Sequence, residues 1–131
     1  MGIGVAQLRL ALAGLAIGAA AAAPVMAAGR PCQVAGSDQG VVQGRLGLLE
    51  GLGPAAFIVT VPGGMCLTGP TQDDNVPDAL SVQLYASTAD GFQDMYRMVG
   101  EKVYVRGKIS GARTYQQKAP LIMEVLDIAT R

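Results

Sequence analysis

The chain has 131 residues, with ten basic side chains, ten acidic side chains and no histidine. A chain of this length provides about one domain, and its balanced charge excludes a protein that binds polyanions through bulk positive charge. The missing histidine removes the commonest catalytic base and the commonest metal ligand, which disfavours an enzyme.

The first 27 residues have the order of segments found in a secretory signal peptide. Arg9 is the only charged side chain in this segment, and residues 10–23 form a run of Ala, Leu, Ile and Gly that Pro24 ends. Small residues precede the expected cleavage after Ala27. We therefore expect Sec-type export, a periplasmic or secreted mature protein, and no stable membrane span after cleavage. An uncleaved anchor is the alternative, but a spanning helix needs about 20 strongly apolar residues.

Two cysteines, Cys32 and Cys66, remain after the expected cleavage. An even number of cysteines in a small exported protein favours one disulfide. A pair of free or metal-binding thiols is the alternative, and it is disfavoured because two cysteines without a histidine do not complete a zinc site. We expect a Cys32–Cys66 disulfide that ties down a loose arm over residues 28–40.

Beyond residue 40, apolar and polar residues alternate in short runs, and turn formers separate the runs. This pattern is typical of an all-β barrel or sandwich. The second run should end at the Pro-Gly-Gly turn of residues 62–64. In the third run, Leu80, Val82 and Leu84 should point inward and Gln83 outward. The five expected strands cover residues 41–49, 56–61, 80–85, 102–109 and 121–128.

One segment changes to a helical period. Its apolar residues recur at i, i+3, i+4 and i+7, which predicts one face of an amphipathic helix; they are Phe92, Met95, Tyr96 and Val99. Asp90 is the expected N-cap, and Gly100 the expected stop. The helix therefore falls between the third and fourth strands.

The resulting order, β-β-β-α-β-β, is typical of an OB-fold, a five-stranded, partly open Greek-key barrel. Gly44 and Gly107 lie inside expected strands, where such a barrel needs bends or bulges. We expect an all-β fold with one helix, in which residues 41–131 form the OB-fold-like domain. An open β-sandwich or another small barrel is the alternative.

Several motifs occur together along the mature chain. A cysteine precedes the first strand, the second strand runs into Cys66, and the third contains Val82-Gln83-Leu84. The fourth strand reads Lys-Val-x-Val-x-Gly from Lys102, and the end reads Pro-Leu-x-x-x-Val-x-x-Ile from Pro120. Together these motifs resemble a family of small exported bacterial proteins with an OB-fold-like domain of no assigned function.

Members of that family often carry histidines in the loop before the last strand. This chain has Ala-Arg-Thr-Tyr-Gln-Gln-Lys at residues 112–118, so no metal or acid–base role carries over from those histidines. In outline, the domain also resembles the pentameric B subunits of subtilase-type toxins, whose OB-folds hold sugars. That second resemblance concerns architecture, which does not determine function.

Few residues in the mature chain suit catalysis or metal binding. No serine lies in a Gly-x-Ser-x-Gly turn, and both cysteines are expected in the disulfide. Asp73, Asp74 and Asp78 lack the spacing and the closing glutamate of a calcium loop, so we expect them to be solvated loop acids. We expect no cofactor, no metal and no enzymatic activity.

A cluster of aromatic and basic residues is the strongest candidate for a ligand site. Its members come from the outward face of the fourth strand and from the loop 111–120 after it: Tyr104, Arg106, Lys108, Arg113, Tyr115 and Lys118. The loop between strands four and five lines the ligand groove of an OB-fold. Rings with interleaved basic groups suit stacking on a sugar or base while holding an anion. A solvated strand face whose lysines protect an edge is the alternative.

The sequence thus favours a non-catalytic binding module whose partner is a glycan, an envelope polymer or an envelope protein. An oligomeric, toxin-like sugar binder is the alternative, which leaves a homo-oligomer open. Binding of single-stranded nucleic acid is disfavoured by the compartment and by the low net positive charge. An acid-pair hydrolase that uses Glu101, Glu124 or Asp127 is disfavoured because these positions share only strand spacing.

Overall fold

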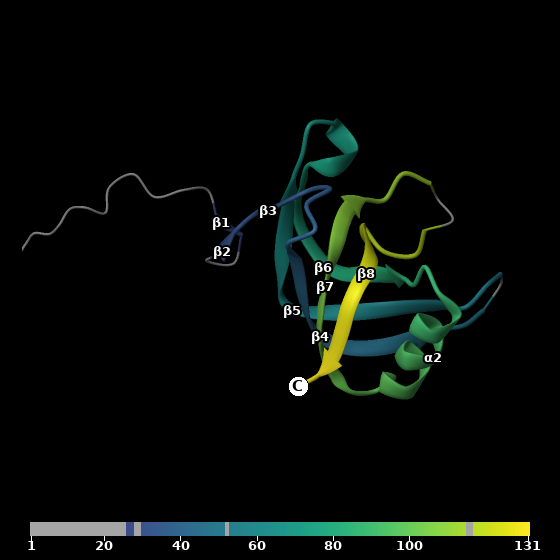
Figure 1. The fold of residues 1–131 in the computed structure, drawn as a ribbon. Helices are drawn as coiled ribbons and strands as arrows, with labels where there is room; N and C mark the ends of the chain where they lie inside the picture. The colour runs from purple at the N-terminus through teal and green to yellow at the C-terminus, as the bar shows by residue number, and fades with distance from the viewer. Residues whose placement is uncertain (1–25, 28–29, 52, 115–116) are drawn as a thin grey trace, which may run out of the picture.

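The computed structural model describes residues 26–27, 30–51, 53–114 and 117–131 (Figure 1). Residues 1–25 of the expected signal peptide and Tyr115 of the candidate cluster lie outside these ranges. Within the described ranges, no helix is both long and apolar enough to cross a membrane.

The described chain is mostly β-structure, with α2 between two long strands. The elements in chain order are β1 (Met26–Ala27), β2 (Arg30–Pro31), β3 (Gln33–Val34), β4 (Gly40–Leu49), β5 (Ala56–Thr68), the 3-10 helix η1 (Gln72–Asp74), β6 (Val76–Tyr85), α2 (Ala89–Met98), β7 (Lys102–Gly111) and β8 (Leu121–Thr130). The five expected strands correspond to β4–β8, so the expected all-β fold with one helix is confirmed for this part of the chain.

The five long strands pair in a ring. The six-stranded sheet has the order β3-β5-β4-β7-β8-β6, and β5 also pairs with β6. Each of β4–β8 therefore pairs with two others of the set. Among these five pairings, β6–β8 is parallel and the other four are antiparallel. In Figure 1, α2 lies at one end of the sheet.

The second long strand does not end at the Pro-Gly-Gly turn, as the sequence predicted. β5 continues through Pro62 to Thr68, and its register with β6 shifts between Thr60 and Met65. Gly63 and Gly64 both have φ near 77°, a left-handed conformation that glycine adopts without steric cost. The glycines therefore bend the strand instead of ending it.

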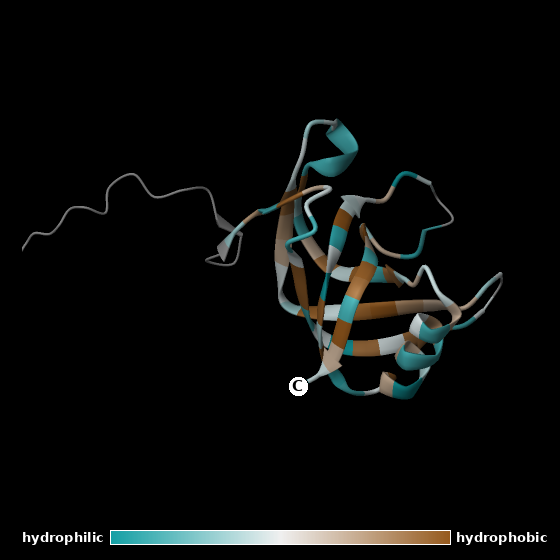
Figure 2. Cartoon of the chain, viewed as in Figure 1, coloured by the Kyte–Doolittle hydropathy of each residue, from teal (hydrophilic) through white to brown (hydrophobic). Residues whose placement is uncertain are grey.

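The register shift also changes which residues of β6 face the core. Val82 and Leu84 are buried as expected, but Leu80 is 63% exposed and its neighbour Ala79 is buried instead. Gln83, which was expected to face solvent, is only 7% exposed. Buried and more exposed residues alternate along β7, whose apolar and polar segments are seen in Figure 2.

The helix begins and packs differently from the sequence prediction. Thr88, not Asp90, is the N-cap, and its hydroxyl accepts a hydrogen bond from the Gly91 N–H at 3.0 Å. Met95 is fully buried, but three other residues of the expected inner face are at least 37% exposed: Phe92, Tyr96 and Val99. The Phe92 and Tyr96 rings cover the edge of the core, because both contact the buried ring of Phe57 at centroid distances of 6.2 and 4.9 Å.

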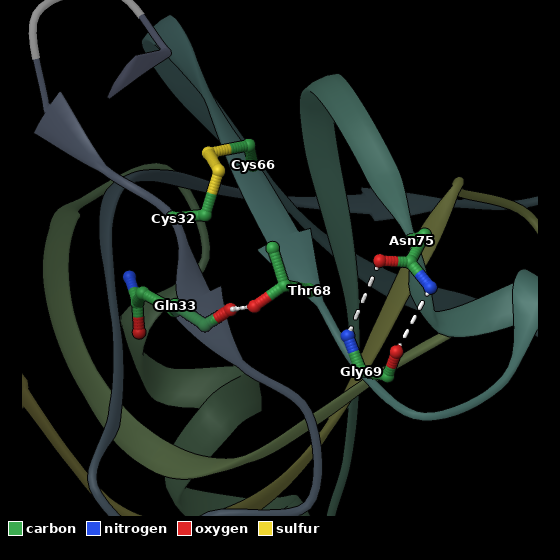
Figure 3. The surroundings of a disulfide bond; sticks show 6 residues. All are labelled: Cys32, Gln33, Cys66, Thr68, Gly69 and Asn75. Carbon is green, nitrogen blue, oxygen red and sulfur yellow. Dashed lines mark hydrogen bonds between the residues drawn. A yellow bond between two sulfur atoms is a disulfide. The ribbon is translucent and has the colours of Figure 1, made fainter. Parts of the chain in front are cut away.

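The N-terminal arm is attached to the sheet more firmly than a loose segment would be. Cys32 and Cys66 form the expected disulfide (Figure 3), and β3 pairs in parallel with the end of β5. The Gln33 side chain also bonds the backbone of Val41 on β4, donating to the carbonyl oxygen at 2.6 Å and accepting from the N–H at 2.7 Å. Gln33–Val34 thus form a sixth strand of the sheet, and the arm is attached there by more than the expected disulfide.

Candidate functional site

A groove of about 1020 Å³ crosses the outer side of β4, β5 and β7, next to the C-terminal end of α2. Its position follows from strand alternation: Val42 and Leu46 face the core, so Gln43 and Arg45, which alternate with them on β4, point away from it. The lining residues are Gln43, Gly44, Arg45, Leu46, Gly47, Thr60, Pro62, Val99, Gly100, Lys102, Val103 and Arg131.

The register of the strands brings two basic residues of the groove together. Arg45 on β4 lies directly opposite Lys102 on β7, and side chains at such positions lie about 5 Å apart at their Cβ atoms. Arg131 joins them because its backbone N–H donates to the carbonyl oxygen of Lys102 at 2.9 Å. Three cations from three separate parts of the chain therefore share one groove.

These three cations have few partners within the protein. Arg45 donates one hydrogen bond, to the carbonyl oxygen of Gly100. The guanidinium carbon of Arg131 lies 5.5 Å from the ring centroid of Tyr104, in a cation–π contact. Among the described residues, no carboxylate forms an ion pair with Arg45, Lys102 or Arg131, and the groove lining contains no acidic residue.

The candidate residues on β7 point outward as expected, but they do not line this groove. Tyr104 lies beside it through its contact with Arg131. Arg106 donates to the carbonyl oxygen of Asp38 at 3.2 Å and lies opposite Asp127 on β8. Lys108 lies opposite Glu124. Acidic neighbours thus offset the charges of Arg106 and Lys108.

The candidate residues after β7 belong to a different region. Arg113 binds both carboxylate oxygens of Asp74 at 2.9 Å and also contacts Asp73 at 3.4 Å. The backbone N–H of Lys118 donates to the Gln83 side chain at 2.7 Å. Arg113 is therefore held to η1 and Lys118 to β6, and in the described structure neither lines the groove.

Asp74 corrects the expectation of solvated loop acids, since it is only 5% exposed. Its carboxylate accepts from the Gly111 N–H at 3.0 Å, from the Thr71 hydroxyl at 3.0 Å and from Arg113. The Gly111 N–H is the largest cause that lowers the pKa of Asp74 below its ordinary value of 3.8, and Arg113 and Thr71 lower it further against the opposing effect of burial. Asp74 thus fastens the β7–β8 loop to η1.

Asp74→Asn should lower the free energy of unfolding by about 2 kcal/mol near neutral pH, because charge-assisted hydrogen bonds are lost. The half-exposed Arg113 limits the effect through solvent screening. The folded-state pKa lies below 3.8, so this contribution is present above the unfolded-state pKa and disappears as the pH falls through the folded-state pKa. Urea denaturation of both proteins at about pH 7 and about pH 3 measures the difference, which should shrink at the lower pH.

Glu50→Gln is the control for Asp74→Asn. Glu50 is exposed in the turn after β4, so its neutralisation should change stability little at either pH. An Asp74→Asn variant as stable as the wild type near neutral pH would contradict the role of Asp74 as a fastening residue.

The remaining acids do not gather into a cluster that could hold a metal, within the part of the chain that the structure describes. Glu124 and Asp127 are exposed on β8. Glu101 stands between two lining residues in the sequence but is not itself in the lining. These positions bring no pair of carboxylates into the groove.

No protein-family model matches the chain, and no curated protein matches it significantly. The function therefore has to be inferred from the groove itself. Sequence reasoning singled out none of the three groove cations, Arg45, Lys102 and Arg131, as site residues. The opposition of Arg45 and Lys102 depends on strand register, which no local sequence pattern specifies.

Proposed function

We propose that this chain is an exported, non-catalytic binding module with an OB-fold, and that its groove holds a glycan or another envelope polymer. The ring of pairings supports the OB-fold, since the first strand β4 pairs with the second and the fourth, and the third strand pairs in parallel with the fifth. The position of α2 between the third and fourth strands agrees with this fold. The disulfide supports export, because disulfides persist in oxidising compartments.

The groove on the outer side of β4, β5 and β7 is the observation that carries this proposal. Its polar lining consists of hydrogen-bond donors on basic and neutral side chains, which suit the hydroxyl and acidic groups of a polymer. Gly47 and Gly100 are also lining residues, and neither has a side chain that would narrow the groove. Such a surface binds and orients a ligand without providing an activated nucleophile.

The groove gives less support to single-stranded nucleic acid, because none of the described residues that line it is aromatic and such proteins stack bases on aromatic side chains. A toxin-like oligomeric sugar binder stays the alternative form of the proposal. Light scattering of the oxidised protein distinguishes the two, since a defined ring of subunits would favour the oligomeric form.

The proposal is tested by closing the groove. A Cβ on Gly47 would have only the Ile58 carbonyl oxygen within 4 Å, at 3.8 Å, so Gly47→Leu adds a side chain to the groove without a backbone clash. We expect the wild type to bind members of a polysaccharide panel, and Gly47→Leu to weaken that binding at least about tenfold, or about 1.4 kcal/mol. Calorimetric titration of the exported, oxidised protein measures the affinity.

Gly51→Leu is the matched control. Gly51 lies in the turn after β4, where an added Cβ would have no atom within 4 Å, and it is outside the groove lining. This variant should bind like the wild type. If Gly47→Leu is folded and binds as tightly as Gly51→Leu, the ligand does not occupy the groove.

A further inference from the structure

We propose that the groove selects oxyanions, and that its ligand carries phosphate, sulfate or carboxylate groups held by Arg45, Lys102 and Arg131. This inference rests on the proposed function, because it names the class of ligand that the same groove would take. It follows from the charges that the fold places together.

The position of Arg45 directly opposite Lys102 lowers the stability of the protein when no ligand is bound. Like charges directly opposite each other on neighbouring strands are destabilising, and this pair occupies one register position of β4 and β7. The backbone bond from Arg131 to Lys102 adds a third cation to the same end of the groove. A bound oxyanion would remove this repulsion, so the arrangement gains more from an anion than from a neutral ligand.

The groove cations differ in their neighbours from other basic residues, since Arg106 and Lys108 lie opposite Asp127 and Glu124 on β8. Arg113 pairs with Asp73 and Asp74, and Arg97 pairs with Asp94. None of the three groove cations has such a partner among the described residues. Two guanidinium groups and an ammonium can together make several charge-assisted hydrogen bonds to the oxygens of one or two anionic groups.

Neutral groups in the groove also suit such a ligand. The Thr60 residue lies opposite Arg45 on the other neighbouring strand, β5, and Gln43 lies opposite Tyr104 on β7. Both are lining residues, and their hydroxyl and amide groups can bond the oxygens that surround an anionic substituent. The register therefore places Thr60, Arg45 and Lys102 in one row across β5, β4 and β7, with Gln43 two positions from Arg45 along β4.

The test compares polymers that differ only in charge. Dextran sulfate and neutral dextran are titrated against the oxidised protein, together with inorganic pyrophosphate as a small probe. We expect dextran sulfate to bind at least about tenfold more tightly than dextran. Lys102→Gln should weaken its binding about tenfold while the melting temperature stays within about 2 °C of the wild type or rises, since a repulsion is removed.

Lys108→Gln is the control for total charge, because it removes one positive charge from an exposed position on β7 outside the groove lining. It should leave the affinity for dextran sulfate within about twofold of the wild type, apart from a small general effect of net charge. Equal losses in Lys102→Gln and Lys108→Gln would indicate diffuse attraction and overturn the inference.

The other outcomes separate this inference from the proposed function. Equal affinity for dextran and dextran sulfate would overturn the selection of oxyanions and leave a glycan-binding module in place. Pyrophosphate binding that Lys102→Gln abolishes, without binding of either polymer, would support the oxyanion site and contradict the polymer-binding function. Binding of none of the three probes would overturn the inference, whereas the polysaccharide panel would still test the function.

Discussion

Reduction of the Cys32–Cys66 disulfide should lower the free energy of unfolding by about 4 kcal/mol, the value that the chain-entropy model gives for a closed loop of this length. The two cysteines are separated by 34 positions. Their bond joins the arm to β5 beside the short parallel pairing of β3 with β5. A two-residue strand cannot hold that position firmly alone, so the disulfide should contribute most of the attachment.

Urea denaturation of the protein with and without reductant measures this loss. The Cys32→Ala/Cys66→Ala double variant should not respond to reductant, which controls for other effects of the reagent. Because Cys66 is only 2% exposed, the double variant also leaves a small cavity and should be slightly less stable than the reduced protein. A reduced protein within about 1 kcal/mol of the oxidised one would show that Gln33 and β3 hold the arm without the disulfide.

Loss of the arm should also remove the hydrogen bonds of Gln33. Its side chain bonds both backbone groups of Val41, and its carbonyl oxygen accepts from the Thr68 hydroxyl at 3.4 Å (Figure 3). The arm thus links β4 and the end of β5. Hydrogen exchange at Val41 should accelerate on reduction, because these bonds depend on the position that the disulfide gives to the arm.

Local pattern predicted most of the fold. The alternation of apolar and polar residues identified β4 and β7 as strands, and it placed Tyr104, Arg106 and Lys108 on the outward face of β7. The disulfide followed from the number of cysteines and the signal-like N-terminus. The helix followed from the change of period near Phe92. Each of these features depends on neighbours in the sequence.

The incorrect predictions came from interactions between distant segments. The bend at Gly63 and Gly64 shifts the register of β5 against β6, and this shift exposes Leu80 and buries Ala79. Gln83 is buried because the loop after β7 bonds its side chain. Neither effect has a signature within β6 itself, so alternation alone misassigned both residues.

The candidate site was missed for the same reason. The expected cluster grouped residues that are close in sequence on β7 and in the following loop. The structure separates them, since Arg113 pairs with Asp74. The groove is lined instead by Arg45 from β4 and by Arg131, the residue that follows β8. Strand pairing brings charges from distant segments together. The residues of a site on a sheet face can therefore be predicted only once the strand register is known.

Gly44→Ala should destabilise the protein by about 3 kcal/mol or prevent folding, because the strand cannot accept a Cβ at this position. A Cβ there would lie 1.9 Å from the carbonyl oxygen of Thr60 and 2.9 Å from its carbonyl carbon. Both are backbone atoms of β5 at the point where it pairs with β4. Relief of the clash would therefore require the two strands to separate beside the groove.

Gly47→Ala provides the matched comparison on the same strand. Its Cβ would have only the Ile58 carbonyl oxygen nearby, at 3.8 Å, which is an ordinary contact. Replacing this glycine restricts the unfolded chain, so the variant should be as stable as the wild type or more stable by about 0.5 kcal/mol. Denaturant unfolding of both variants gives the two free energies of unfolding.

The contrast between the two glycines tests the geometry on which the groove depends. Equal stability of both variants would mean that β4 and β5 do not approach closely at Gly44, and the pairing of Arg45 with Thr60 would then be wrong. A large loss in Gly44→Ala alone would support the close approach that sets the register of β4. That register also places Arg45 opposite Lys102, so the position of the groove cations depends on the absence of a side chain at residue 44.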